Sequence, residues 1–195
     1  MRFQILIMGA ILVFGSAWAS GAPWFGRSGV RKANESLHQQ GAPKVSHHVL
    51  ERVATDNIRV HISLSKQRAY LMINNEVAID TPISSGKSAG MTPTGSFRIL
   101  DKTPDHRSSL YGDFVDSQGR VVRAGVSSRI DSAPSGTRFQ GSPMLYFMRF
   151  HGGVGMHIGL LPGYPASHGC VRMPAAIAPM FYQRVRVGTP VVVAY

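Results

Sequence analysis

The chain of 195 residues contains a single cysteine, Cys170, so no disulfide can form within it. It also has few acidic residues, 10 Asp and Glu against 21 Lys and Arg, which gives a formal net charge of +11. The sequence shows no basic run with interleaved aromatic residues, no zinc-finger spacing, no internal repeat and no glycine-rich nucleotide fingerprint. These absences argue against a nucleic-acid partner and a nucleotide cofactor. The positive charge is consistent with a role in solubility or with another kind of anionic partner.

The first residues are typical of a targeting signal. Arg2 precedes the apolar run 5–15, and Ala17 and Ala19 form the A-x-A pattern that signal peptidase cleaves. Even when it is extended to Ala19, the apolar run is shorter than the ~20 residues that span a bilayer. We therefore predict a signal peptide in residues 1–19 and export to the periplasm or cell wall. The alternative is an uncleaved anchor, and only through this segment would the protein touch a membrane.

The rest of the chain divides into two regions. Residues 20–54 show weak periodicity, which predicts a flexible tether with a short helix near its end. Residues 55–195 are expected to form one domain, because short apolar stretches in them alternate with period two and are separated by turns. The predicted strands are 58–64, 69–73, 77–83, 96–100, 144–150, 153–158 and 189–195. With Pro179 in the first turn of a short helix ending near Arg184, this predicts a mainly β fold.

Residues 105–143 differ from the rest of the predicted domain. They are polar and rich in glycine, and only "SQG" (117–119) suggests a hairpin. We expect a long loop region here, either a lid over a site or a surface insertion.

Cys170 lies in the turn-like stretch "PASHGCVRMP" (165–174), which is an unusual place for a cysteine that only packs in a core. A thiolate is the reactive form of cysteine, and a basic or positively charged neighbour promotes it. Arg172 supplies such a charge, and Gly169 permits a sharp turn that can aim a backbone N–H at an oxyanion. Three histidines, 151, 157 and 168, are candidate bases. A cysteine, a histidine and an amide-lined turn are the minimal set for acyl transfer.

Other interpretations use the same residues. The three histidines and Cys170 are ligand types that zinc accepts, but their spacing matches no standard zinc site, and we predict no metal. Ser167 is a weaker candidate nucleophile because no G-x-S-x-G elbow surrounds it. A domain that binds without catalysis is a third possibility, although binding alone does not require a thiol.

Several strings resemble the L,D-transpeptidase (YkuD-type) catalytic domain, over about 70% of the chain from Ile58 onward. These strings are "SHGCVRM" (167–173), "TPTGSFRI" (92–99), "GMHIG" (155–159) and the stretch 62–87. The resemblance implies a β-sandwich of mixed sheets for residues 55–195, without a cofactor.

The resemblance also implies a role for each site residue. Cys170 would be the nucleophile and His157 the base, Arg172 would hold a substrate carboxylate, and Ser167, His168 and the amides of Gly169 and Cys170 would complete the site. One departure concerns the base. Nine residues separate His157 from Ser167, where many members have a dozen or more, and fifteen separate His151 from Ser167. His157 is favoured because it ends an apolar strand, and His151 remains the alternative.

The activity implied by the resemblance is acyl transfer on the cell wall. A peptidoglycan tetrapeptide stem would acylate Cys170 and release D-alanine, and an amine acceptor would then resolve the thioester. The acceptor is expected to be another stem, a lipoprotein lysine or a D-amino acid. With water as acceptor, the enzyme would be an L,D-carboxypeptidase. Carbapenem-type β-lactams are the expected inhibitors.

Overall fold

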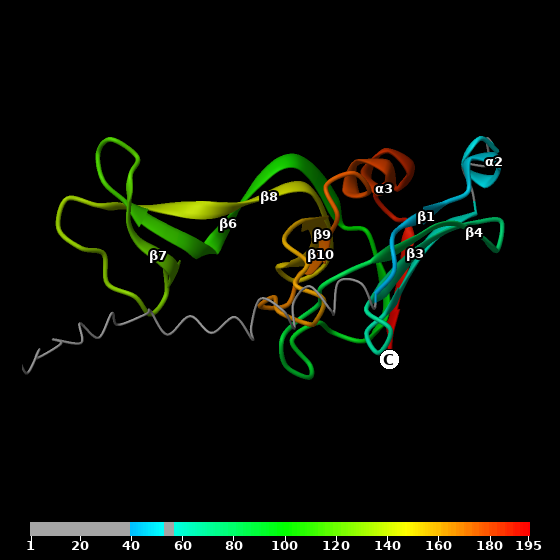
Figure 1. Cartoon of the computed structure of the whole chain (residues 1–195), viewed down its shortest axis with the longest axis horizontal. Coiled ribbons are helices and arrows are strands. Elements are labelled where there is room, and N and C mark those ends of the chain that lie inside the picture. The colour runs from blue at the N-terminus through cyan, green and yellow to red at the C-terminus, as the bar shows by residue number, and fades with distance from the viewer. Residues whose placement is uncertain (1–39, 53–56) are drawn as a thin grey trace, which may run out of the picture.

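The computed structural model describes residues 40–52 and 57–195, so the predicted signal peptide 1–19 lies outside the described residues. Strands make up 51% of the structure and helices 7%, and there are two mixed sheets and two short helices among the described residues, which confirms the prediction of a mainly β fold of mixed sheets with one or two short helices. In Figure 1 the strands form a layered body, from which an arm that contains β6, β7 and β8 extends. No helix among the described residues has the length and apolarity needed to cross a membrane.

The first sheet has six strands. In spatial order they are β1 (Lys44–Val45), β4 (Glu76–Pro82), β3 (Arg68–Ile73), β2 (Ile58–Ser63), β11 (Pro190–Ala194) and β5 (Gly95–Arg98). β11 pairs parallel to β2, and the other neighbours are antiparallel. Asn74 and Asn75 join β3 to β4 with φ values of 50° and 68°, the left-handed conformation that a two-residue hairpin turn requires.

The second sheet has five strands, in the order β10 (Val171–Met173), β9 (Val154–Ile158), β8 (Arg138–His151), β6 (Asp101–Val115) and β7 (Val121–Ser127). β10 is parallel to β9, and all other pairs are antiparallel. The parallel pair places Met156–Ile158 beside Val171–Met173, the strand that follows Cys170.

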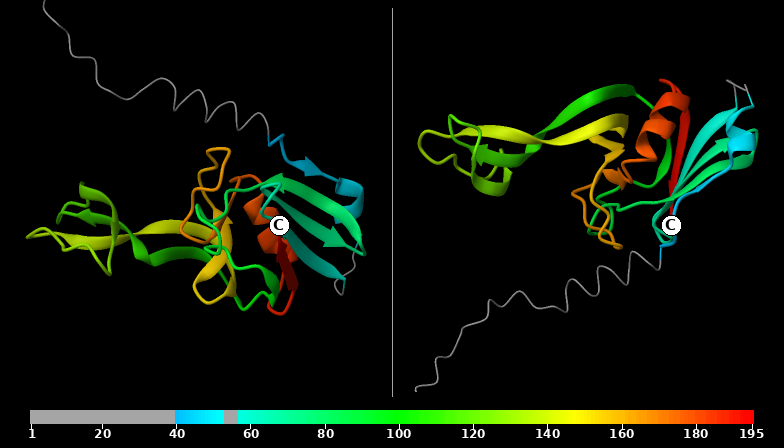
Figure 2. Two further views of the ribbon diagram at one scale, coloured as in Figure 1. Left: turned by 90° about the horizontal axis from the view of Figure 1, so that it is seen from below. Right: turned by 45° about the horizontal axis from the view of Figure 1, so that its top comes forward.

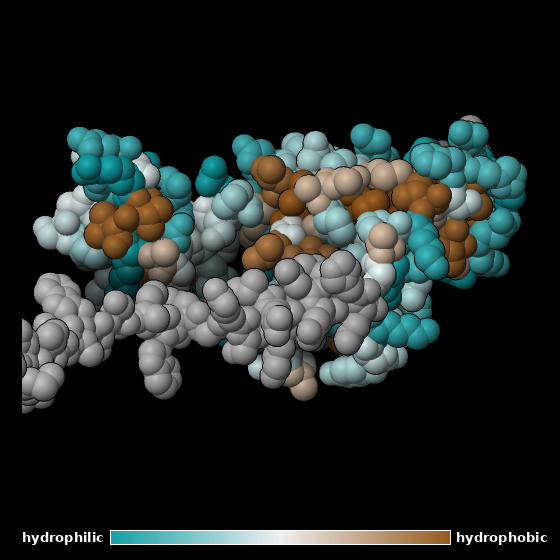
Figure 3. All heavy atoms as spheres, in the orientation of Figure 1, coloured by the Kyte–Doolittle hydropathy of each residue, from teal (hydrophilic) through white to brown (hydrophobic). Residues whose placement is uncertain are grey.

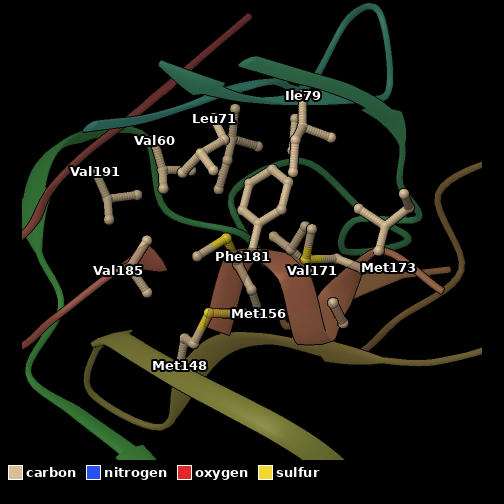
Figure 4. Close-up of a cluster of buried hydrophobic side chains, with 14 of the residues drawn as sticks. Val60, Leu71, Ile79, Met148, Met156, Val171, Met173, Phe181, Val185 and Val191 are labelled. Atoms are coloured by element: carbon tan, nitrogen blue, oxygen red, sulfur yellow. The ribbon is translucent and has the colours of Figure 1, made fainter. Parts of the chain in front are cut away.

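The main core lies between the two sheets, around the short helix α3 (Ala178–Arg184). Figure 4 shows the Phe181 ring of α3 directed toward Leu71 and Ile79 of the first sheet, with Met148 and Met156 of the second sheet on its other side. Phe181 is fully buried. Pro179 occupies the first turn of α3, as predicted, since proline needs no N–H partner there.

The predicted tether differs from the structure over residues 40–52. This segment carries β1, which pairs with β4, and a short helix, α2 (His47–Leu50). Val49 and Leu50 are buried in the main core, and the Arg68 guanidinium donates to the carbonyl oxygens of Gln40 and Gly41. A short helix was expected near the end of this segment, but its packing in the core was not, because only two adjacent apolar residues anchor it and two are too few to produce a periodic pattern in the sequence.

The prediction of a long loop region in 105–143 is wrong. β6 and β8 pair along most of this stretch and, with β7, form the arm that Figures 1 and 2 show extending from the body. Most of the arm is exposed on both faces, so its strands carry no apolar alternation that could reveal them. Gly112 and Gly141 permit the close approach of β6 and β8, because added Cβ atoms would lie 2.1 Å from Gln140 O and 1.9 Å from Ser108 O. The predicted hairpin around 117–119 is confirmed.

Candidate active site

The parallel pairing of β9 and β10 brings three of the predicted residues to one face of the second sheet. Arg172 lies opposite His157 and Val171 opposite Met156, so Cys170, one residue before β10, comes opposite Gly155. Side chains alternate along a strand, so Cys170 and Arg172 lie on the same face, and His157 shares it. The Phe147 ring occupies the space over Gly155, since a Cβ at residue 155 would lie 2.5 Å from that ring.

The turn that carries Cys170 is held by two hydroxyl groups. Ser167 Oγ donates to the carbonyl of Cys170 at 2.5 Å and accepts from the amide of Gly169 at 3.0 Å. Thr92 Oγ1 donates to the carbonyl of Gly169 at 2.7 Å and accepts from the amide of Gly86 at 2.8 Å. Gly169 has a φ of 137°, which non-glycine residues rarely adopt, and a Cβ would lie 2.8 Å from Met91 O.

The Cys170 thiol is partly buried and donates to the carbonyl oxygen of Gly153 at 3.7 Å. Burial raises the pKa of this thiol above its ordinary value, and the nearby Gly155 amide and Arg172 charge only partly oppose that rise in pKa. Cys170 is therefore a protonated thiol at neutral pH, and it needs a base to become a nucleophile.

His157 is buried, with 7% of its surface exposed. Its Nδ1 lies 2.6 Å from the carbonyl oxygen of Ile158, and because a carbonyl only accepts, Nδ1 carries the proton and Nε2 has a free lone pair. Burial lowers the pKa of His157 to about 4, and the charges of Arg172 and His106 add to this, although the bond to Ile158 opposes it. The ring is thus a neutral base at pH 7, and no hydrogen bond joins it to the thiol in the described structure.

His168 is exposed, and its ring contacts Tyr111 and Lys87. Its ring stacks on Tyr111 of β6, with centroids 4.2 Å apart and planes at 14°, and its Nε2 lies 3.3 Å from Lys87 Nζ. Burial lowers the pKa of His168, and the positive charges of Lys87 and Arg172 lower it further. Through these contacts, His168 links the turn that carries Cys170 to β6 and to Lys87.

Arg172 is fixed by its backbone and by its aliphatic stem. Its N–H donates to Ser84 O and its carbonyl accepts from Ser84 N–H, both at 3.0 Å. The stem lies directly over Gly159, where a Cβ would approach Arg172 Cγ to 2.7 Å. The guanidinium forms no ion pair with any carboxylate of the described residues.

A family model for the L,D-transpeptidase catalytic domain, YkuD, matches residues 57–193. The chain belongs to this family. The comparison with curated proteins found no match.

Solved L,D-transpeptidases share the fold. An enzyme from Xylanimonas cellulosilytica is 22% identical, with a TM-score of 0.52, and the match covers 72% of this chain and 62% of that one. One from Mycobacterium smegmatis is 24% identical, with a TM-score of 0.51 and coverage of 70% and 58%. A third, LdtMt1 in complex with imipenem, is 24% identical, with a TM-score of 0.52 and coverage of 71% and 59%. The chain thus spans roughly three fifths of the length of these relatives.

Within this YkuD domain, the predicted residues fall into two groups. Cys170, His157 and Arg172 share one face, whereas His151 is exposed at the end of β8 and packs against the ring of Phe97, 5.1 Å between centroids. The Gly169 amide, expected to contact an oxyanion, is already bonded to Ser167.

Three residues near the turn were missed by the sequence analysis: Thr92, Lys87 and Tyr111. Thr92 begins the quoted "TPTG" string, which was the available signal for it. Lys87 and Tyr111 come from regions distant in sequence, and no pattern in the sequence connects them with His168. Residues 40–52 and 57–195 contain no group of three or more His, Cys, Asp or Glu side chains placed to hold a metal.

Proposed function

We propose that this protein is an exported L,D-transpeptidase that transfers an acyl group from a peptidoglycan tetrapeptide stem to an amine. The single observation that carries the proposal is the common face of Cys170, His157 and Arg172 on β9 and β10. A thiol, a neutral imidazole and an unpaired guanidinium on one rigid face are what acyl transfer from a carboxylate-bearing peptide requires.

Acylation begins when His157 Nε2 takes the proton of the Cys170 thiol. The sulfur then attacks the carbonyl carbon between the third stem residue and the terminal D-alanine, and the S–C bond forms. The amide of Cys170 is oriented by the turn to donate to the oxyanion. The C–N bond breaks, His157 returns the proton to the departing amine of D-alanine, and a thioester remains on Cys170.

Deacylation runs the same steps with a new nucleophile. An acceptor amine attacks the thioester carbonyl, and His157 takes a proton from that amine. The C–S bond then breaks, and the proton returns to the sulfur. The acceptor proposed is a second stem, a lipoprotein lysine or a D-amino acid. Water in the same position would make the enzyme an L,D-carboxypeptidase.

Arg172 is proposed to bind a carboxylate of the stem, because a guanidinium offers two parallel N–H donors to that group. The proposed location also fits the charge of the chain. A protein with a net charge of +11 and a predicted signal peptide in residues 1–19 would meet a carboxylate-rich polymer in the periplasm or cell wall.

The test is to incubate purified protein with a tetrapeptide stem and follow the intact mass. We expect a mass increase equal to the stem minus D-alanine on the wild-type protein, and none on Cys170→Ala, which should remain folded. An adduct on Cys170→Ala would contradict the nucleophile. Chromatography of the products then distinguishes cross-linked dimers, which indicate transpeptidation, from tripeptides alone, which indicate hydrolysis. Imipenem is expected to form an adduct with the wild-type protein only.

A further inference from the structure

The segments that build the candidate site contain no acidic residue. Neither 81–100, which includes Lys87, nor 132–195, which includes Cys170 and Arg172, has an Asp or Glu. None of the side-chain ion pairs among the described residues includes Lys87 or Arg172. Two cationic side chains, Lys87 and Arg172, therefore act on His168, two residues before Cys170, without an ion-pair partner among the described residues.

Lys87 is held in place although its side chain is exposed. An ammonium group only donates, so at 3.3 Å the Nε2 of His168 must be the acceptor, and His168 carries its proton on Nδ1. The His168 ring is itself fixed by the stack on Tyr111. Lys87 makes no further side-chain hydrogen bond within the described structure, so its other N–H donors remain available to a ligand.

Backbone hydrogen bonds hold residues 84–87 against Ser167 and Arg172, on either side of Cys170. The Lys87 amide donates to Ser167 O at 2.9 Å, and Ser84, three residues earlier, exchanges two hydrogen bonds with Arg172. The pKa of His168 is lowered by burial and by both cations, which indicates that His168 lies within the field of each and stays neutral at pH 7. Lys87 also lines a cavity of about 150 Å³ on the side of Ser85 and Pro165, and this cavity does not reach Cys170.

Resting on the function proposed above, we propose that Lys87, positioned by His168, binds a second substrate carboxylate, in addition to the one bound by Arg172. Two fixed cations without acidic partners repel each other, and an anionic ligand removes this cost while gaining charge-assisted hydrogen bonds. The substrate class is accordingly a peptide that presents at least two free carboxylates near the reacting carbonyl. A ligand with a carboxamide at the Lys87 position would leave the ammonium unpaired and bind more weakly.

The second carboxylate can belong to the acyl donor or to the acceptor, and two half-reactions distinguish these sources. For the donor, acylation is measured with two tetrapeptide stems, one with a free side-chain carboxylate on the third residue and one with the carboxamide there. For the acceptor, aminolysis of the preformed thioester is measured with a D-amino acid and with its amide. The variants are Lys87→Met, Lys87→Arg and, as matched control, Lys44→Met, which removes an exposed lysine on β1 of the other sheet.

If the donor supplies the carboxylate, Lys87→Met should lower acylation by the carboxylate stem about tenfold at subsaturating stem, and leave the carboxamide stem unchanged. If the acceptor supplies it, acylation stays unchanged, and aminolysis by the D-amino acid falls about tenfold while that by the amide does not. Lys87→Arg should retain most of the rate, and Lys44→Met should match the wild type.

The proposal is overturned if Lys87→Met equals the wild type with all four substrates, or if it slows carboxylate and carboxamide substrates equally. Calorimetry separates this outcome from failure of the proposed function. Binding of the carboxylate stem and of the D-amino acid to Cys170→Ala is measured with and without Lys87→Met. Weaker binding of the stem or of the D-amino acid to the double variant supports the carboxylate site. A wild type that forms no thioester would refute the proposed acyl transfer, but it would not affect this result. Unchanged binding of both ligands overturns the carboxylate site.

Discussion

Ser167 Oγ donates to the carbonyl of Cys170 at 2.5 Å while it accepts from the amide of Gly169 at 3.0 Å, so one buried hydroxyl closes the turn that carries Cys170. Ser167 is 2% exposed. Its role is therefore to orient the backbone on both sides of Gly169, and with it the amide and thiol of Cys170. A hydroxyl group donates and accepts through a single oxygen atom, as Ser167 Oγ does here.

We expect Ser167→Ala to lower the acylation rate about tenfold, because the turn that aims the Cys170 amide loses two restraints. The free energy of unfolding should fall by about 1–3 kcal/mol, since the Cys170 carbonyl and Gly169 amide lose their partner. Single-turnover mass spectrometry and urea denaturation measure the two effects. Ser167→Thr keeps the hydroxyl and should restore most of the rate. Equal rates for wild type and Ser167→Ala would show that the hydroxyl does not position the nucleophile.

The pKa directions of Cys170 and His157 predict an unusual pH–rate profile. Burial raises the pKa of the thiol above 9.0 and lowers the pKa of the imidazole to about 4, so both groups are neutral between these limits. Acylation should be nearly constant from about pH 5 to about pH 8, fall as His157 becomes protonated, and rise at alkaline pH as the thiolate forms. Stopped-flow acylation by a tetrapeptide stem measures this. A rate that falls steadily as the pH drops below neutral would instead indicate a base with a pKa near the ordinary 6.5 of histidine, which would contradict a buried neutral His157.

The buried neutral state of His157 also makes folding stability depend on pH. Its folded pKa of about 4 lies below the ordinary 6.5, so between these values the unfolded chain binds a proton that the folded chain does not. Stability from this residue is complete above pH 6.5 and is lost as pH falls toward 4, by about 3 kcal/mol in total.

Urea denaturation at a series of pH values measures this loss. His157→Gln should show a shallower decline between pH 7 and pH 4 than the wild type, whatever its stability at pH 7. The exposed His61 provides the control, and His61→Gln should follow the wild-type curve. Parallel curves for His157→Gln and wild type would mean that His157 is not the buried neutral base.

The sequence predicted most of the body of the fold because its strands are buried on at least one face. Val60, Leu71 and Ile79 lie in the core and give β2, β3 and β4 their period-two pattern. The arm lacks such a pattern, since its strands are held by backbone pairing and by glycines at close contacts. Glycine content alone suggests a loop, and only the partner strand reveals that Gly112 must fit against Gln140.

The candidate site was predictable where its residues are close along the chain. "SHGCVRM" contains Cys170, its turn and Arg172. The parallel pairing of β9 with β10 then places His157, and not His151, opposite Arg172. Lys87 and Tyr111 could not be inferred, because they reach His168 only through tertiary packing. The extent of β8 could not be inferred either, because its first half is defined by pairing with β6 in the arm and not by a pattern in its own sequence.

Gly159→Ala provides a test of Arg172 that leaves the guanidinium in the chain. A Cβ at residue 159 would lie 2.7 Å from Arg172 Cγ and 2.9 Å from its Cβ and Cδ, so the stem must move. A shift of the charged group should raise the KM for the stem about tenfold, because charge-assisted pairs depend on geometry, while kcat changes less. A double-mutant cycle shows whether the effect passes through Arg172. If it does, Gly159→Ala adds nothing in an Arg172→Ala background, since the displaced group is already absent. Additive losses would show that Gly159 acts independently of Arg172, and an unchanged KM in the single variant would show that the position of the guanidinium is not critical for stem binding.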